Sequence, residues 1–332
     1  ASPQKDPLPP HILQQMKLPD RWSAIRGLHF PPPDSDLRLL NSFRSPAQWR
    51  LIFEEFFWLE CGLELKRARA RLDPGIGFQL SERVREQIKK MLPFKPTGAQ
   101  KRVLAEIAHD MAAPHPMYRL LQGDVGSGKT LVAAEAAIIA IENGYQVAVL
   151  APTEILATQH YLSARRILEN AGYRIVLLTG SLEQDRKRDI RRHVAQGNAQ
   201  LVIGTHALLE EKVEFEKPGL IIVDEQHRFG VLQRLKLMKK GGDVGDTQPE
   251  PDVLVMTATP IPRTLALTLY GDLDISVLDE LPPGRTPIVT RRVSDDRATE
   301  VWSFVRKQVA AANQAYIVYP VIEENEETEL KA

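Results

Sequence analysis

Short apolar runs recur along the middle of the chain, and stretches with helical periodicity separate them. The apolar runs lie at 146–151, 174–178, 200–204, 219–224 and 253–257. The helical stretches lie near 131–143, 154–171, 182–196 and 231–240. Because the runs are apolar at nearly every position, we expect strands that are buried on both faces of a parallel sheet. This alternation predicts a doubly wound α/β domain, which binds its ligands beyond the carboxyl ends of the strands.

A glycine-rich segment connects a further short strand, at 117–121, to the helix near 131–143. Residues 123–130 read Gly-Asp-Val-Gly-Ser-Gly-Lys-Thr and match the phosphate-loop pattern G-x-x-x-x-G-K-[ST]. We expect the main-chain N–H groups of this loop to bind a nucleotide triphosphate. Lys129 would reach the β and γ phosphates, and the Thr130 hydroxyl would hold Mg²⁺. The expected nucleotide-binding residues of the loop are Gly123, Asp124, Val125, Gly126, Ser127, Gly128, Lys129 and Thr130.

The strand at 219–224 ends in Asp224-Glu225-Gln226-His227. A carboxylate at this position can hold Mg²⁺ through its water shell, which is the role expected of Asp224. Glu225 can then orient or deprotonate the attacking water. His227 is interpreted as a relay in catalysis, although a histidine here can also be a hydrogen-bonded structural residue.

The next strand ends in Thr257-Ala258-Thr259. Small hydroxyl residues at a strand end can hydrogen-bond the hydrolytic centre on one side and a moving loop on the other. Because this segment follows the acidic pair, we expect Thr257 and Thr259 to couple the hydrolytic centre to the moving loop.

The flanking regions differ from this central pattern. Residues 1–36 are rich in proline and predict a tether without long elements, because proline removes a donor and fixes φ. A helix is expected over 46–71, ending in a basic run that is either a solvated helix end or a phosphate-contacting patch, and a short helix over 81–91. After a linker at 282–287, a strand, a helix and a strand are expected at 288–292, 296–312 and 315–319.

Composition adds little about partners. The chain has 332 residues with 43 acidic and 43 basic side chains, so its overall charge gives no indication of nucleic-acid binding. Its single cysteine, Cys61, cannot form an internal disulfide, which favours a reducing cytoplasm. No apolar run is long enough to predict a membrane span.

Together, three segments resemble the RecG family of bacterial ATP-dependent DNA helicases in superfamily 2. They are the loop at 123–130, Asp-Glu-Gln-His-Arg-Phe-Gly-Val-Leu-Gln-Arg at 224–234 and Met-Thr-Ala-Thr-Pro-Ile-Pro-Arg-Thr-Leu at 256–265. The resemblance implies an ATP-binding RecA-like domain at 92–281. It also implies a helical connector from a wedge domain at 1–91, and the truncated start of a second RecA-like domain at 282–332.

Further residue roles follow from this resemblance. Gln100 matches the adenine reader, with Phe94 as an apolar neighbour. Thr153, Thr205 and His206 lie in segments similar to those that grip the backbone of one DNA strand. The implied activity is Mg²⁺- and ATP-dependent remodelling of branched DNA in repair and recombination, in the bacterial cytoplasm and without a membrane partner.

The chain differs from that family in the domains that we expect it to lack. The wedge domain is missing, as is most of the second motor domain with its arginine finger, so we expect this chain alone to hydrolyse ATP hardly at all. The roles of Arg228 and Arg263 stay open between phosphate or acid contacts and surface ion pairs.

The sequence leaves alternative functions open. The motor of the transcription-repair coupling translocase is a close alternative, although that family usually carries Glu in place of Gln226 and lacks Ser127. A binding module without turnover is another. A small-molecule phosphotransferase is disfavoured, because it would need neither the segment at 257–259 nor Gln100.

Overall fold

The structure is a computed structural model that describes residues 5–91, 95–168, 171–224, 249–259, 273–280 and 289–318. The chain divides into two compact units, Ala1–Pro283 and Gly284–Ala332, which are described separately below. The expected helix at 231–240 and the expected linker at 282–287 lie outside the described residues.

The N-terminal region is helical, which corrects the expectation of a tether at 1–36. Its helices are α1 (Pro10–Gln15), α2 (Arg21–His29), α3 (Leu37–Asn41) and α4 (Pro46–Ala70). The prolines do not break these helices, because Pro10 and Pro46 occupy first helical turns, where no intrahelical N–H bond is lost. Asp20 begins α2 by accepting a hydrogen bond from the N–H of Ser23 at 2.9 Å.

A buried arginine ties these helices together. Arg50 on α4 is fully buried, and its guanidinium lies 2.7 Å from Asp6 Oδ1 and 2.5 Å from Glu54 Oε2. Asp6 also accepts hydrogen bonds from the N–H groups of Leu8 and Arg21, and these contacts help hold its pKa below the ordinary range. Burial favours pairing of this kind, because an unpaired buried charge would cost several kcal/mol, on the order of 3–5.

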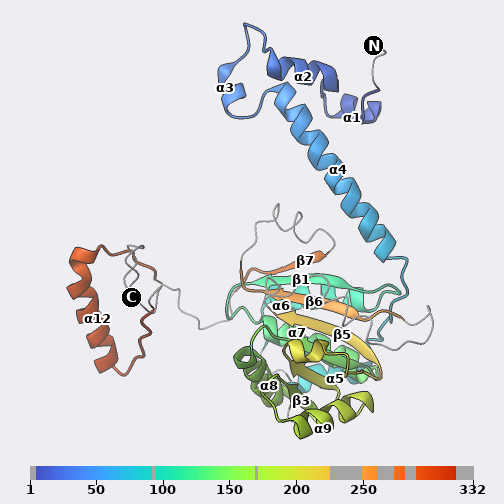
Figure 1. The fold of residues 1–332 in the computed structure, drawn as a ribbon, viewed down its shortest axis with the longest axis vertical. Helices are drawn as coiled ribbons and strands as arrows, with labels where there is room; N and C mark the ends of the chain where they lie inside the picture. The colour runs from blue at the N-terminus through green and yellow to red at the C-terminus, as the bar shows by residue number, and fades with distance from the viewer. Residues whose placement is uncertain are drawn as a thin grey trace. The chain divides into compact units, whose positions relative to one another are not determined.

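Within the first unit, seven strands form a parallel sheet in the order β3-β4-β2-β5-β6-β1-β7 (Figure 1). Its strands are β1 (Tyr118–Gly123), β2 (Gln146–Leu150), β3 (Ile175–Leu178), β4 (Leu201–Gly204), β5 (Pro218–Asp224), β6 (Asp252–Thr257) and β7 (Asp274–Leu278). All pairings between neighbouring strands are parallel, so the predicted α/β class is confirmed. The apolar runs predicted every strand except β7.

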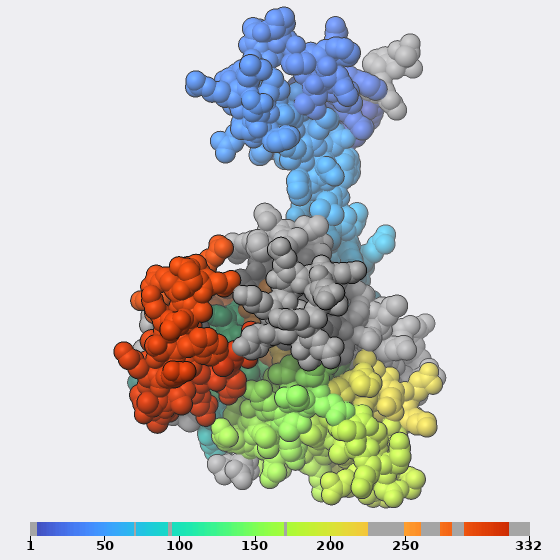
Figure 2. Space-filling view, turned by 60° about the vertical axis from the view of Figure 1, so that its left-hand side comes forward, coloured from blue at the N-terminus to red at the C-terminus, as the bar shows by residue number. Residues whose placement is uncertain are grey.

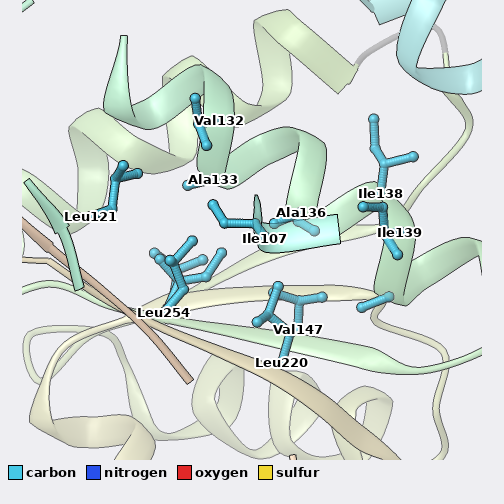
Figure 3. Packing of buried hydrophobic residues seen from close by; sticks show 14 of the residues in the cluster. Ile107, Leu121, Val132, Ala133, Ala136, Ile138, Ile139, Val147, Leu220 and Leu254 are labelled. Carbon is cyan, nitrogen blue, oxygen red and sulfur yellow. The ribbon is translucent and has the colours of Figure 1, made fainter. Parts of the chain in front are cut away.

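Helices cover both faces of this sheet. They are α5 (Glu82–Met91), α6 (Gly98–Met111), α7 (Lys129–Glu142), α8 (Glu154–Leu168), α9 (Gln184–Ala195) and the 3-10 helix η2 (His206–Leu209). Helices α5 to α8 pack on one face, and α9 and η2 pack on the other. Alternate residues of one strand enter different cores: Leu220 faces the first and Ile221 the second. In Figure 3, side chains of α7, including Val132, lie over Leu220 and Leu254 of the sheet.

Polar contacts attach the edge strand β7. Arg119 on β1 donates from Nη1 to Ser276 Oγ on β7 at 2.7 Å and from Nε to Asp110 Oδ2 on α6 at 2.8 Å. Ser276 in turn donates to Glu106. This network compensates for the polar residues of β7, which a search for continuous apolar runs passes over.

In the second unit, the structure describes a 3-10 turn, η5 (Asp295–Arg297), followed by α12 (Ala298–Ala310). The helix predicted at 296–312 is confirmed. The predicted flanking strands are wrong within the described residues 289–292 and 315–318, which are not in strands, because no partner strand is present there to complete their hydrogen bonds. Figure 2 shows this unit in orange, and Trp302 and Phe304 of α12 are exposed.

Candidate nucleotide and nucleic-acid site

The glycine-rich loop turns sharply between β1 and α7. Gly126 has φ of 78° and Gly128 has φ of 95°, a left-handed backbone that residues with a Cβ rarely adopt. At Gly128 a Cβ would also lie 2.2 Å from Gln100 Nε2. Gly128 is followed directly by Lys129, the first residue of α7, so the positive end of that helix begins inside the loop.

Lys129 lies against the main chain of the same loop. Its Nζ donates to the carbonyl of Gly123 at 2.7 Å and to that of Asp124 at 3.0 Å. The ammonium group and the N–H groups at the start of α7 therefore occupy one small region. This is the arrangement that binds a phosphate chain at the start of a helix.

The carboxylate of Asp224 stands at the carboxyl end of β5. Asp224 is 9% exposed, and its Oδ2 lies 2.6 Å from Nε2 of His160 on α8. Thr130 is exposed in the first turn of α7. A hydroxyl and a carboxylate are hard oxygen donors, which fit a Mg²⁺ ion that keeps most of its ligands as water and phosphate oxygens.

The described residues lack two kinds of feature. They contain no group of three or more His, Cys, Asp or Glu side chains that could enclose a metal ion. They also include no helix with the length and hydropathy needed to cross a bilayer.

Gln100 joins the start of α6 to the phosphate loop. The helix begins after Thr97, whose Oγ1 accepts from Gln100 N at 3.2 Å, while Gln100 Oε1 accepts from Thr97 N at 2.9 Å. Gln100 Nε2 donates to the carbonyl of Ser127 at 2.9 Å. The expected adenine reader is thus buried against the loop that is expected to hold the phosphates.

Three segments meet at the carboxyl ends of β2, β3 and β4. Thr153 precedes α8, and its Oγ1 accepts from Leu156 N at 3.3 Å. Glu154 accepts from Ser181 N at 2.9 Å and from Ser181 Oγ at 2.5 Å, and these hydrogen bonds lower the pKa of Glu154. His206 is exposed beside Gly180. The segment at 179–181 was not predicted to belong to this edge; only its position after a strand could have indicated it.

Several predicted roles stay predictions. Thr205 is 1% exposed, and its Oγ1 has no hydrogen-bond partner within the described part of the chain, so its hydroxyl faces inward. Thr257 is equally buried and accepts from Thr259 N at 3.2 Å. Glu225, His227 and Phe94 lie outside the described residues, as do Gln226, Arg228 and Arg263.

Comparison with known proteins agrees with the motifs. The DEAD/DEAH box helicase family matches residues 97–268. "ATP-dependent DNA helicase RecG" of Aquifex aeolicus is 44% identical over 325 residues, which are 98% of this chain and 40% of the relative. The protein of that name in Escherichia coli strain K12 is 46% identical over 327 residues, which are 98% of this chain and 46% of the relative.

A solved structure, "Structure of RecG bound to three-way DNA junction", matches with a TM-score of 0.79 and 42% identity. The match covers 96% of this chain and 41% of the other. The resemblance to RecG helicases inferred from the motifs is therefore confirmed. The chain spans less than half the length of these relatives. It belongs to the DEAD/DEAH box helicase family.

Proposed function

We propose that this chain is the ATP-binding motor region of a bacterial DNA helicase that remodels branched DNA in the cytoplasm during repair and recombination. The observation that carries the proposal is the phosphate loop between β1 and α7, with Lys129 Nζ lying over the loop carbonyls. Asp224 stands at the end of β5, on the same edge of the sheet. Carboxyl ends of parallel strands share one edge, so nucleotide and metal donors lie together there.

The chemistry assigned to the site is ATP hydrolysis. Loop N–H groups and Lys129 would bind the phosphates, and Asp224 and Thr130 would hold Mg²⁺. When bound, Mg²⁺ supplies charge that stabilises the developing negative charge on the phosphate oxygens. Glu225 would orient or deprotonate the attacking water. His227 would act as a relay in catalysis beside this acidic pair.

Branched DNA is proposed as the partner. It would bind at the edge of the sheet where Thr153, Glu154 and His206 lie. These side chains follow β2 and β4, and the contact of Glu154 with Ser181 adds the end of β3. The relative in the solved structure is bound to a three-way DNA junction. Strand β6 lies between β5 and β1 in the sheet; Thr257 ends this strand and Thr259 follows it, and there they would couple nucleotide and DNA.

A binding module without turnover is the second candidate, and the length of the chain favours it for the chain alone. Fewer than half of the residues of the RecG relatives are present. An arginine finger on a second motor domain would supply about 10³–10⁵ in rate, judged from related phosphate-loop enzymes. We therefore expect weak Mg-ATP binding and little hydrolysis by the chain itself.

The test is phosphate release by this chain and by a longer protein that joins it to the remaining domains of a RecG relative, each with and without a forked DNA. DNA-stimulated hydrolysis by the longer protein, lost on Lys129→Ala and kept in the control Lys101→Ala on exposed α6 surface, would support the helicase motor. ATP binding without hydrolysis in the longer protein would favour the binding module. Equal DNA-stimulated rates in the chain and the longer protein would contradict the argument from length.

A further inference from the structure

The contact between His160 and Asp224 joins helix α8 to the end of β5. Nε2 and Oδ2 lie 2.6 Å apart, and the two side chains are 15% and 12% exposed. An ionised carboxylate can only accept, so His160 Nε2 donates this hydrogen bond. The two residues are 64 positions apart in the chain. Such a short contact between largely buried side chains fixes the direction in which the carboxylate points.

The surroundings of His160 restrict what else the ring can do. It lines a small apolar cavity of about 40 Å³ between α7, α8 and the sheet. The cavity walls include Ala133, Ala164 and Ile203, and Thr130 lines the same space. The ring therefore has apolar packing on one side and the Asp224 carboxylate as a polar partner. Apolar walls keep an imidazole in one orientation without competing for its N–H.

The orientation of the Asp224 carboxylate decides which of its oxygens can reach a metal ion. One of its two oxygens, Oδ2, is engaged by His160, so Oδ1 is the oxygen available to a metal ion or to its bound water. Mg²⁺ requires near-ideal octahedral geometry, so a rotated carboxylate is a poorer ligand. Groups that hydrogen-bond a ligating carboxylate from behind commonly change metal affinity by about 10–100-fold when removed.

We propose that His160 is a positioning residue that holds the Asp224 carboxylate in the orientation required for Mg²⁺. The proposal rests on the proposed function, because it assumes that Asp224 and Thr130 hold the metal of a nucleotide complex. His160 lies on α8, about 9 Å along the helix axis from Glu154, at 1.5 Å per residue. The helix that begins at the DNA-facing edge therefore also carries the side chain that orients the metal ligand.

The test measures metal binding and not turnover. Mn²⁺ would be titrated into the chain with a non-hydrolysable ATP analogue, and free Mn²⁺ would be followed by electron paramagnetic resonance. We expect His160→Ala to weaken Mn²⁺ binding about 10–100-fold, while binding of the analogue in the presence of EDTA is unchanged. His160→Gln keeps an N–H donor at a similar reach and should bind Mn²⁺ within about threefold of the unaltered chain.

Controls separate positioning from packing. Gln159→Ala alters an exposed neighbour on the same helix and should leave Mn²⁺ affinity unchanged. If His160→Ala fails to fold, His160→Leu retains apolar packing against the cavity and replaces it in the comparison. Mn²⁺ affinity in the Ala or Leu variant within twofold of the unaltered chain would overturn the proposal. No gain in the Mn²⁺ affinity of the unaltered chain when the analogue is added would instead contradict the proposed function.

Discussion

The side-chain amide of Gln100 donates from Nε2 to the main-chain carbonyl of Ser127, with a distance of 2.9 Å. The other end of the same amide, Oε1, accepts from the N–H of Thr97, at the start of α6. Gln100 is 3% exposed, so both contacts are sheltered from water. One amide thus joins the first turn of α6 to the phosphate loop. A movement of the loop would therefore shift Gln100, the residue expected to read adenine.

Gln100→Glu is expected to break the contact between α6 and the phosphate loop and to weaken the recognition of adenine. The carboxylate cannot donate, so it would place an acceptor against the Ser127 carbonyl and leave that contact unmade. We expect a loss of about 1–3 kcal/mol in the free energy of unfolding, together with weaker discrimination between ATP and GTP. Urea unfolding and competition between the two nucleotides measure these effects. Gln159→Glu, on the exposed face of α8, makes the same charge change as a control; equal behaviour of the two variants would remove Gln100 from this role.

Lys129→Ala is expected to lose nucleotide binding and keep the fold. The ammonium group donates to the main-chain carbonyls of Gly123 and Asp124, while a charge-assisted bond to phosphate contributes about 1.5–3 kcal/mol. The affinity for a fluorescent ATP analogue should therefore fall at least tenfold. Circular dichroism checks the fold, and Lys101→Ala is the matched control. Unchanged affinity would exclude residues 123–130 as the phosphate site.

Local patterns predicted the fold where burial was continuous. Strand β5 is buried along nearly its whole length, and its sequence is apolar throughout until Asp224. Strand β7 was missed because its residues Asp274 and Ser276 are polar, and the buried Ser276 hydroxyl is hydrogen-bonded to Arg119 and Glu106 from distant parts of the chain. The helix expected over 46–71 is confirmed as α4, whereas α1, α2 and α3 were not predicted, because proline disfavours a helix interior although it is well tolerated in the first turn.

The site shows the same limit. The phosphate loop and Asp224 were predicted because their residues are consecutive or end a strand. His160 and Glu280 were not predicted, because their partners Asp224 and Ala99 are 64 and 181 positions away in the chain. Such contacts depend on which strands become neighbours, and a single sequence read without homologues does not specify that order.

Asp252 predicts a dependence of stability on pH. It begins β6, is 2% exposed, and accepts from Met117 N at 2.7 Å through Oδ1. Burial raises the pKa of its carboxyl from 3.8 to about 8. Between these values the folded chain keeps a proton that the unfolded chain has released. This contribution to stability is therefore complete below about pH 4 and is lost as the pH rises through about 8.

Asp252→Asn should remove that dependence, because the amide keeps an acceptor for Met117 and cannot ionise. The unaltered chain should lose at most about 1.4 kcal/mol per pH unit from this group across the window, and the variant should lose none of it. Chemical unfolding at several pH values between 4 and 8 gives both slopes. Asp185→Asn, at an exposed position on α9, is the control. Parallel slopes for the unaltered chain and Asp252→Asn would show that the carboxyl is ionised throughout.

Glu280 binds the start of the helix that carries Gln100. Its Oε2 accepts from Ala99 N at 3.0 Å, and the neighbouring Asp279 accepts from Arg102 Nη2 at 2.7 Å. A carboxylate at the first turn of a helix satisfies an otherwise unpaired N–H and interacts favourably with the helix dipole. Glu280 lies two residues after Leu278, the last residue of β7, so its contact with Ala99 joins the end of this strand to the first turn of α6.

Glu280→Ala is therefore expected to lower the free energy of unfolding by about 1 kcal/mol, as for loss of a helix cap, and to weaken ATP binding through Gln100. Glu280→Gln keeps an acceptor for Ala99 and loses only the charge, so its cost should be about 0.3–1 kcal/mol. Urea unfolding and nucleotide titration would be measured on both variants. Glu211→Ala, exposed and remote from α6 in sequence, is the control. If Glu280→Ala unfolds like that control and binds ATP normally, the contact with Ala99 does not stabilise α6, and Gln100 is positioned by Thr97 and Ser127 alone.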